Sequence, residues 1–323
     1  MMRRCYRRAI IAVLAGALVF TAAPWATRAA TQTDAVHPAA RVVTDEVGRR
    51  VVLPPEIKRV VTLAPNLTET LYALGLGDRL AGDTNECDKP AAAKTKPHVG
   101  EPQNPSLEAI TALHPDLVLA TTSINRIETA VALERLGIPV YTSDPHTVRD
   151  MLDSTARLAK LLGAGPQIEE IVPRLHERLA AVRARLADEP VVHVLFVVWE
   201  DPLITIGQHT FPADELLWAG AESVVLSKQN WPQLSLEEVV RLQPEYIVFA
   251  GHGSENAATE LADLRARAIW KDLRAVQMGH VVDIGEEAVR PSPGLVDAVE
   301  HLALALHPDA FPDKSDTEKS KPE

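Results

Sequence analysis

Histidine, cysteine and serine supply the candidate catalytic groups of this chain, but none has the spacing that a catalytic motif requires. His176-Glu177 opens like the zinc-binding pattern His-Glu-x-x-His, yet residue 180 is alanine, so the second histidine is missing. Gly251-His252-Gly253-Ser254 is not the Gly-x-Ser-x-Gly pattern of hydrolases. Cys87 is a lone thiol without a nucleophile motif around it. A metal-dependent enzyme is therefore the least supported function class.

Tryptophan offers a different kind of chemistry, the stacking of a flat ligand. Trp231 lies in the polar loop Gln229-Asn230-Trp231-Pro232, where a large aromatic side chain is hard to bury. Trp199 follows an apolar run and is a second candidate, whereas Trp218 and Trp270 occupy helical positions and are predicted to be core residues. The alternative for Trp231 is that it packs beneath its own loop, and we favour the ligand contact.

Charged residues near the end of a predicted strand form the next candidate group. Residues 281–284 are an apolar strand pattern, and Glu286 and Arg290 follow it. Open α/β sheets bind ligands beyond the carboxyl ends of their strands. We therefore predict that both side chains line a binding cleft, with an ordinary solvated loop as the alternative.

An internal repeat shows how these residues are positioned. Residues 105–119 recur at weaker identity as residues 234–248, and each copy reads as a capped helix, a proline stop and a buried strand. The repeat predicts two similar lobes with a ligand cleft between them. It also places Glu108 and Glu237 at matching first-turn positions, where the helix dipole alone already favours an acid. Their matched occurrence favours docking to a partner.

The remaining pattern predicts an α/β fold in which each lobe is a mainly parallel sheet flanked by helices. Residues 41–55 read as an edge hairpin, and Asn66 and Asn125 as helix N-caps, with Glu69 as the capping-box partner of Asn66. Residues 166–187 predict one long connecting helix, kinked near Pro173. We thus expect an N-terminal lobe over residues 41–146, a connecting helical segment over 147–188, a C-terminal lobe over 189–308 and a disordered tail over 309–323.

Residues 1–30 have the pattern of a signal peptide, with four arginines before an eleven-residue apolar run that is too short to span a bilayer. Cys5 precedes that run, so it is not a lipoprotein acceptor, and we expect an exported, soluble protein. Removing five basic residues with this segment changes the formal charge from −11 to −16, which argues against nucleic acid as a partner. Cys87 then remains as the single cysteine, so no internal disulfide forms.

Several motifs in order resemble the periplasmic substrate-binding proteins with a helical backbone, the family that serves importers of cobalamin, siderophores and haem. The resemblance covers about residues 41–307 and is carried by residues 59–69, 105–120, 270–281 and 290–293. Within that family, Trp231-Pro232-Gln233-Leu234-Ser235 and Asn85-x-Cys87-Asp88 are most similar to the cobalamin-binding branch.

The resemblance implies two lobes joined by one long helix, with a ligand held between them and delivered to a membrane ABC transporter in the periplasm. It implies that Glu108 and Glu237 face arginines of the transporter permease. Where the cobalamin proteins carry aromatic residues in the first lobe, this chain has Glu86, Pro102 and Thr121. A corrinoid is the first ligand hypothesis, and haem or a ferric siderophore is the alternative. We expect a monomer without a resident cofactor or metal site, whose ligand-binding residues are Asn66, Glu86, Gln103, Thr121, Trp199, Trp231, His252, Glu286 and Arg290.

Overall fold

The computed structural model describes residues 41–165, 170–250 and 257–312, without the side chains of residues 286 and 287. Residues 39–323 form one compact unit. The predicted signal peptide and the position of His252 lie outside the described residues. Within the described ranges, no helix has both the length and the apolar character needed to cross a membrane.

The first lobe is built on a parallel sheet with the strand order β4-β3-β7-β8. All five residues of β7 are buried, as expected for a strand that helices cover on both faces. The hairpin predicted at residues 41–55 is confirmed as β1 and β2, with Gly48 at φ 82° in the turn. The strands are β1 (Arg41–Thr44), β2 (Arg50–Leu53), β3 (Val60–Thr62), β4 (Leu80–Gly82), β5 (Gly100–Glu101), β6 (Asn104–Pro105), β7 (Leu117–Thr121) and β8 (Val140–Ser143); the helices are α1 (Pro65–Ala73), α2 (Leu107–Ala112) and α3 (Ile127–Arg135).

The second lobe repeats this sheet. β9 pairs in parallel with β11 and β12, and β12 pairs with β13, so the order β11-β9-β12-β13 matches that of the first lobe. The far end of β9 instead pairs with β10, an antiparallel addition that the sequence did not indicate. The predicted fold class is confirmed. The strands are β9 (Val192–Glu200), β10 (Leu203–Thr205), β11 (Ala221–Ser223), β12 (Tyr246–Phe249) and β13 (Val281–Asp283); the helices are α6 (Phe211–Trp218), α7 (Leu236–Leu242), α8 (Ala257–Ala266), α9 (Arg274–Met278) and α10 (Leu295–Leu306).

The two copies of the repeat share a backbone device. Ser106 and Ser235 each cap their helix by accepting a backbone hydrogen bond, at 3.1 Å from Ala109 N and 3.3 Å from Glu238 N. The residue before each proline adopts the left-handed conformation, His114 at φ 46° and Gln243 at φ 45°. In both copies this turn leads the chain from the helix into the strand that follows.

The acid after each proline ties the repeat to the central strand of its sheet. Asp116 Oδ2 accepts hydrogen bonds from the backbone nitrogens of Lys58 and Arg59, both at 2.8 Å, just before β3. Glu245 Oε1 accepts one from His193 N at 3.1 Å in β9. The acids at these two positions therefore fix the register between neighbouring strands.

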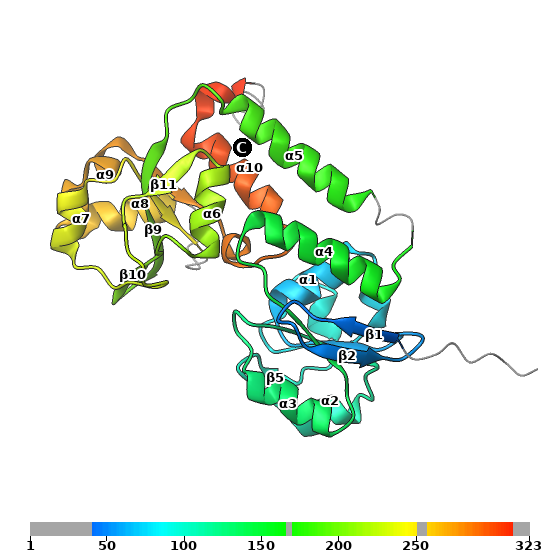
Figure 1. Ribbon diagram of the computed structural model, residues 1–323. Coiled ribbons are helices and arrows are strands. Elements are labelled where there is room, and N and C mark those ends of the chain that lie inside the picture. The colour runs from blue at the N-terminus through cyan, green and yellow to red at the C-terminus, as the bar shows by residue number, and fades with distance from the viewer. Residues whose placement is uncertain (1–40, 166–169, 251–256, 313–323) are drawn as a thin grey trace, which may run out of the picture. The chain divides into compact units, whose positions relative to one another are not determined.

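The connecting segment consists of two helices instead of the one predicted, α4 (Val148–Leu162) and α5 (Ile171–Arg185) (Figure 1). Gly163 ends α4 in the left-handed conformation at φ 60°. Pro173 lies in the first turn of α5, where its missing N–H removes no helical hydrogen bond. A kink within a helix was therefore the wrong reading of this proline.

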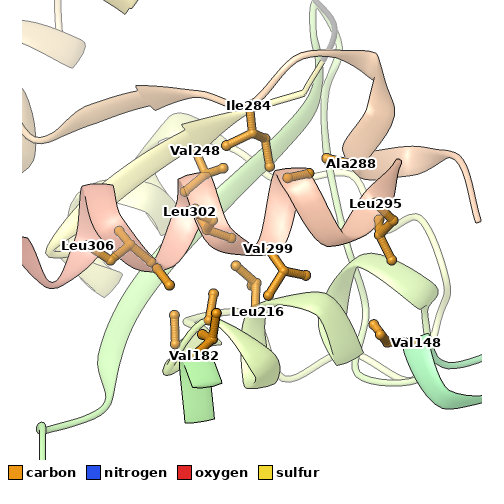
Figure 2. Packing of buried hydrophobic residues seen from close by; sticks show 14 of the residues in the cluster. Val148, Val182, Leu216, Val248, Ile284, Ala288, Leu295, Val299, Leu302 and Leu306 are labelled. Carbon is orange, nitrogen blue, oxygen red and sulfur yellow. The ribbon is translucent and has the colours of Figure 1, made fainter. Parts of the chain in front are cut away.

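Helix α4 contributes to the cores of both lobes. Its start packs Val148, Met151 and Leu152 into the cluster formed by α5, α6 and α10. Figure 2 shows Val148 among the side chains of this cluster, with Leu216, Leu295 and Val299. The end of the same helix packs Leu158, Ala159, Leu161 and Leu162 into the first-lobe cluster beneath β3 and β7. One helix thus shares its apolar face between the two lobes.

Two predicted features at the ends of elements were wrong. Asn66 does not cap α1, because Pro65 already occupies the first turn and Ala64 is the N-cap residue; Asn66 is buried inside the helix. The C-terminal boundary also shifts, because Phe311 is only 3% exposed and packs with α5 and α10. Arg185 lies over its ring, 5.1 Å from the centroid. Residues 309–312, which the prediction assigned to the tail, therefore belong to the folded chain.

Candidate functional site

Two exposed tryptophans lie at the antiparallel edge of the second-lobe sheet. Trp199 at the end of β9 pairs with Ile204 of β10, and Ile204 bridges to Gln233. Trp231 lies two residues before Gln233, in a bend outside the strands, so this bridge brings its loop to the same edge as Trp199. The two indoles are 58% and 52% exposed.

The two tryptophans come from opposite sides of β10. Trp199 belongs to β9, which pairs with β10, and Trp231 belongs to the loop before Gln233, which bridges to β10. The indole nitrogen of Trp199 donates to the backbone oxygen of Asp201 at 2.9 Å, which fixes the ring orientation. The sequence indicated both tryptophans, and the pairing of β9 with β10 and the bridge to Gln233 bring them to one edge of the sheet, which we call the tryptophan platform.

Gly207 fixes the loop that presents Trp231. Its nitrogen donates to Asn230 O at 2.9 Å, and Gln208 N donates to Ser227 O at 2.9 Å. A Cβ at residue 207 would lie 1.9 Å from Gln229 O, so only glycine permits this approach of two backbones. Gly207 is a positioning residue that the sequence analysis missed.

The first-lobe residues of the predicted site divide into exposed and buried pairs. Glu86 and Gln103 are exposed in neighbouring loops. Asn85 joins those loops, since its backbone nitrogen donates to Gly100 O at 3.0 Å and its side chain to Glu101 at 2.7 Å. Asn66 and Thr121 are buried, at 6% and 0% exposure.

Asn125 was predicted to cap α3, but it holds the first-lobe loops together instead. Its Nδ2 donates to Leu63 O at 2.7 Å and to Pro102 O at 2.9 Å, and its Oδ1 accepts from Thr121 N at 2.8 Å. One amide therefore joins the ends of β3 and β7 to the loop that carries Gln103. Asparagine is needed because the site requires both donors and an acceptor.

Arg290 forms ion pairs with two carboxylates of the first lobe. Its Nη1 donates to Glu69 Oε1 at 3.0 Å and to Asp88 Oδ1 at 2.9 Å, and Ser292 Oγ donates to Glu69 Oε2 at 2.6 Å. Burial by itself would raise the pKa of Asp88, but the hydrogen bond and charge of Arg290 outweigh it and lower that pKa. Glu69, expected to close a capping box, is instead part of this contact. The side chain of Glu286 lies outside the described residues.

Buried polar groups secure the loop over residues 83–88. Cys87 is 1% exposed, and its Sγ lies 3.1 Å from Thr68 Oγ1 and 3.2 Å from Thr84 Oγ1. Burial raises the pKa of this thiol, so Cys87 is a packing residue of low reactivity. Asp83 is fully buried and contacts His98 Nδ1 at 2.7 Å, and burial raises the pKa of its carboxyl.

A cavity of about 730 Å³ lies between α1 and α10. Its lining includes Glu69, Tyr72, Lys89, Ser292 and His301. None of the predicted ligand residues whose side chains the structure describes lines it, so the cavity and the tryptophan platform are separate surfaces. Among the residues that the structure describes, no group of three or more histidine, cysteine or acidic side chains could hold a metal ion.

Glu108 and Glu237 occupy the same position of equivalent helices, the second residue of α2 and of α7, and both are exposed. Next to Glu237, Glu238 is committed to a capping box, with its Oε2 accepting from Ser235 N at 3.0 Å. These hydrogen bonds lower the pKa of Glu238. Within the described ranges, neither Glu108 nor Glu237 has an ion-pair partner.

Two similar parallel sheets, a shared helix and an aromatic platform at strand ends define a two-lobed α/β protein that binds a ligand. The family model for periplasmic binding proteins matches residues 60–288, and the chain belongs to that family.

Related proteins agree with this assignment. The chain is 29% identical over 246 residues to the vitamin B12-binding protein of Vibrio parahaemolyticus, covering 75% of this chain and 87% of that protein. It is 30% identical over 278 residues to an uncharacterized ABC transporter substrate-binding lipoprotein of Bacillus subtilis, covering 83% and 86%. The crystal structure of the periplasmic vitamin B12-binding protein of Vibrio cholerae is similar with a TM-score of 0.69 at 29% identity, covering 79% of this chain and 98% of that one.

Proposed function

We propose that this protein is a periplasmic carrier that binds a corrinoid and delivers it to a membrane ABC importer, without catalysing a reaction. The observation that carries the proposal is the platform of Trp199 and Trp231 in a chain of this family. The vitamin B12-binding relatives from two Vibrio species support the choice of ligand, and the Bacillus subtilis relative supports the transporter.

The platform fits a corrin ring by its shape and chemistry. Indole rings contribute large apolar area and a π face, which together favour stacking on a flat macrocycle. Glu86 and Gln103 of the first lobe are exposed and polar, and they would hydrogen-bond to amide groups at the edge of such a ring. In this proposal the metal of the chelate arrives with the ligand, and the protein supplies none of its own.

Absorbance spectroscopy on purified protein tests the ligand directly. Cobalamin, haem and a ferric siderophore are each incubated with the protein, and the retained ligand is measured after gel filtration. We expect cobalamin to be retained. Retention of haem or the siderophore alone would replace the corrinoid by the alternative ligand, and retention of none would refute the proposed ligand class.

Substitution of the platform tests its role. We expect Trp231→Ala to weaken cobalamin binding by about 1–3 kcal/mol in calorimetry, because stacked aromatic area is lost. Met278 on α9 is 58% exposed, so Met278→Ala is a matched control that leaves affinity unchanged. Full affinity in Trp231→Ala would remove this residue from the site.

Docking to the permease is proposed for Glu108 and Glu237. Each would form a charge-assisted pair with an arginine of one permease half. Changing both to lysine should leave cobalamin affinity intact and abolish uptake in cells, because like charges then meet at both contacts. Glu128, exposed in the first turn of α3, provides the control variant Glu128→Lys. Normal uptake by the double variant would refute the docking role, and lost ligand affinity would place these residues in the ligand site.

A further inference from the structure

We infer that Arg290 is a positioning residue. It holds α1 and the first-lobe loop over residues 83–88, which we call the ligand loop, to the second lobe through Glu69 and Asp88. The inference rests on the proposed binding function. It concerns one group of side chains, Glu69, Asp88, Arg290 and Ser292, which we call the interlobe clasp. The sequence predicts a different role for Arg290, a direct contact with the ligand, because this residue follows β13.

The clasp closes a triangle of contacts around the ligand loop. Thr68 on α1 donates to Cys87 in the loop, Asp88 of the same loop accepts from Arg290, and Arg290 also donates to Glu69, the neighbour of Thr68. The loop thus cannot move from α1 or from the second lobe without breaking one of these contacts. Glu86, a predicted ligand residue, lies in this loop.

The location of the clasp makes its hydrogen bonds effective. The side chains of Arg290 and Glu69 are 14% and 12% exposed, while that of Asp88 is 40% exposed. Partial exclusion of water strengthens charge-assisted hydrogen bonds, and little of the Arg290 surface remains for a ligand. Removing the guanidinium would leave two carboxylates facing each other, which disfavours the same arrangement of the two lobes.

The cavity beside the clasp explains why these few side chains matter. Glu69 and Ser292 line the space of about 730 Å³ between α1 and α10. Over that space the two helices are not packed against each other. Side-chain contacts at the edge of the cavity therefore join α1 to the second lobe there, in addition to the packing of α4 into both lobes.

A double-mutant cycle in the mature protein tests the inference with Glu69→Gln, Arg290→Met and the double variant. Spin labels at Glu128→Cys in α3 and Ala262→Cys in α8, both exposed positions, report the distance between the lobes. Buried Cys87 is protected from labelling. We expect each single variant to broaden the distance distribution of the ligand-free protein and to raise the dissociation rate of cobalamin about tenfold, within the range of typical coupling between sites. The double variant should add little to either effect.

Arg178→Met is the matched control. It removes another arginine that pairs with two carboxylates, Asp297 and Glu300, both on α10. We expect it to leave the interlobe distance unchanged. If Arg290→Met weakens binding while Glu69→Gln changes neither binding nor distance, Arg290 contacts the ligand directly and the inference is overturned. Should the parent protein fail to retain cobalamin, the proposed function fails, and the distances in the ligand-free variants still decide whether the clasp holds the lobes.

Discussion

Glu215 is a fully buried carboxyl whose replacement should make the protein less sensitive to pH. It lies on α6 with 0% exposure, and among the described residues neither carboxyl oxygen has a hydrogen-bond partner. Burial raises its pKa well above the ordinary value of 4.5, because an ionised carboxylate is poorly solvated there. The folded state therefore keeps a proton on Glu215 that the unfolded chain loses as the pH rises.

The size of the effect follows from this difference in proton binding. A raised pKa in the folded state contributes stability at low pH, and the contribution is lost as the pH rises from 4.5 towards the folded value. One proton changes the free energy of unfolding by about 1.4 kcal/mol per pH unit. The loss from this residue between about pH 5 and 7 is therefore about 2–3 kcal/mol at most, the limit reached when the folded protein keeps the proton over the whole range. Glutamine does not ionise, so the stability of Glu215→Gln does not include this pH-dependent loss.

Urea unfolding of the native protein and Glu215→Gln at both pH values measures the effect. We expect the free energy of unfolding of the variant, relative to native, to increase on going to the higher pH, by about 2–3 kcal/mol at most. Glu128→Gln, at an exposed position, should show no such change. An equal difference between native and Glu215→Gln at both pH values would refute the reasoning, since Glu215 would then be ionised within the fold.

Two further substitutions test positioning residues. Gly207→Ala should lower the free energy of unfolding by about 1–3 kcal/mol in urea titrations and weaken ligand binding, because the new Cβ must displace the backbone before Trp231; unchanged affinity would show that this backbone does not position the tryptophan. Asn125→Ala should lower the free energy of unfolding by about 2 kcal/mol or more, because it leaves the backbone oxygens of Leu63 and Pro102 without this hydrogen-bond donor. Asn125→Asp keeps the acceptor for Thr121 N but loses both donors, so equal stability of native and Asp variants would contradict the role of the amide.

The sequence by itself determined the parts of the fold that depend on neighbours along the chain. The sequence predicted two equivalent helix–strand pairs, and through them two lobes. The signals were the capping serines Ser106 and Ser235, the proline after each helix and the apolar runs. These signals are local, because a cap or a turn acts within a few residues. The exposure of Trp231 was predictable for the same reason.

Tertiary structure decided which residues act together. Asn66 and Asn125 have the side chain of a cap, but one is buried in a helix and the other joins three separate segments. Arg290 pairs with Glu69 across more than two hundred residues of sequence, and no pattern near either residue predicts this ion pair. Trp199 and Trp231 lie at the same sheet edge only because β10 pairs with β9 and bridges to Gln233. Contacts of this kind depend on how the completed elements pack, and sequence spacing carries no record of that packing.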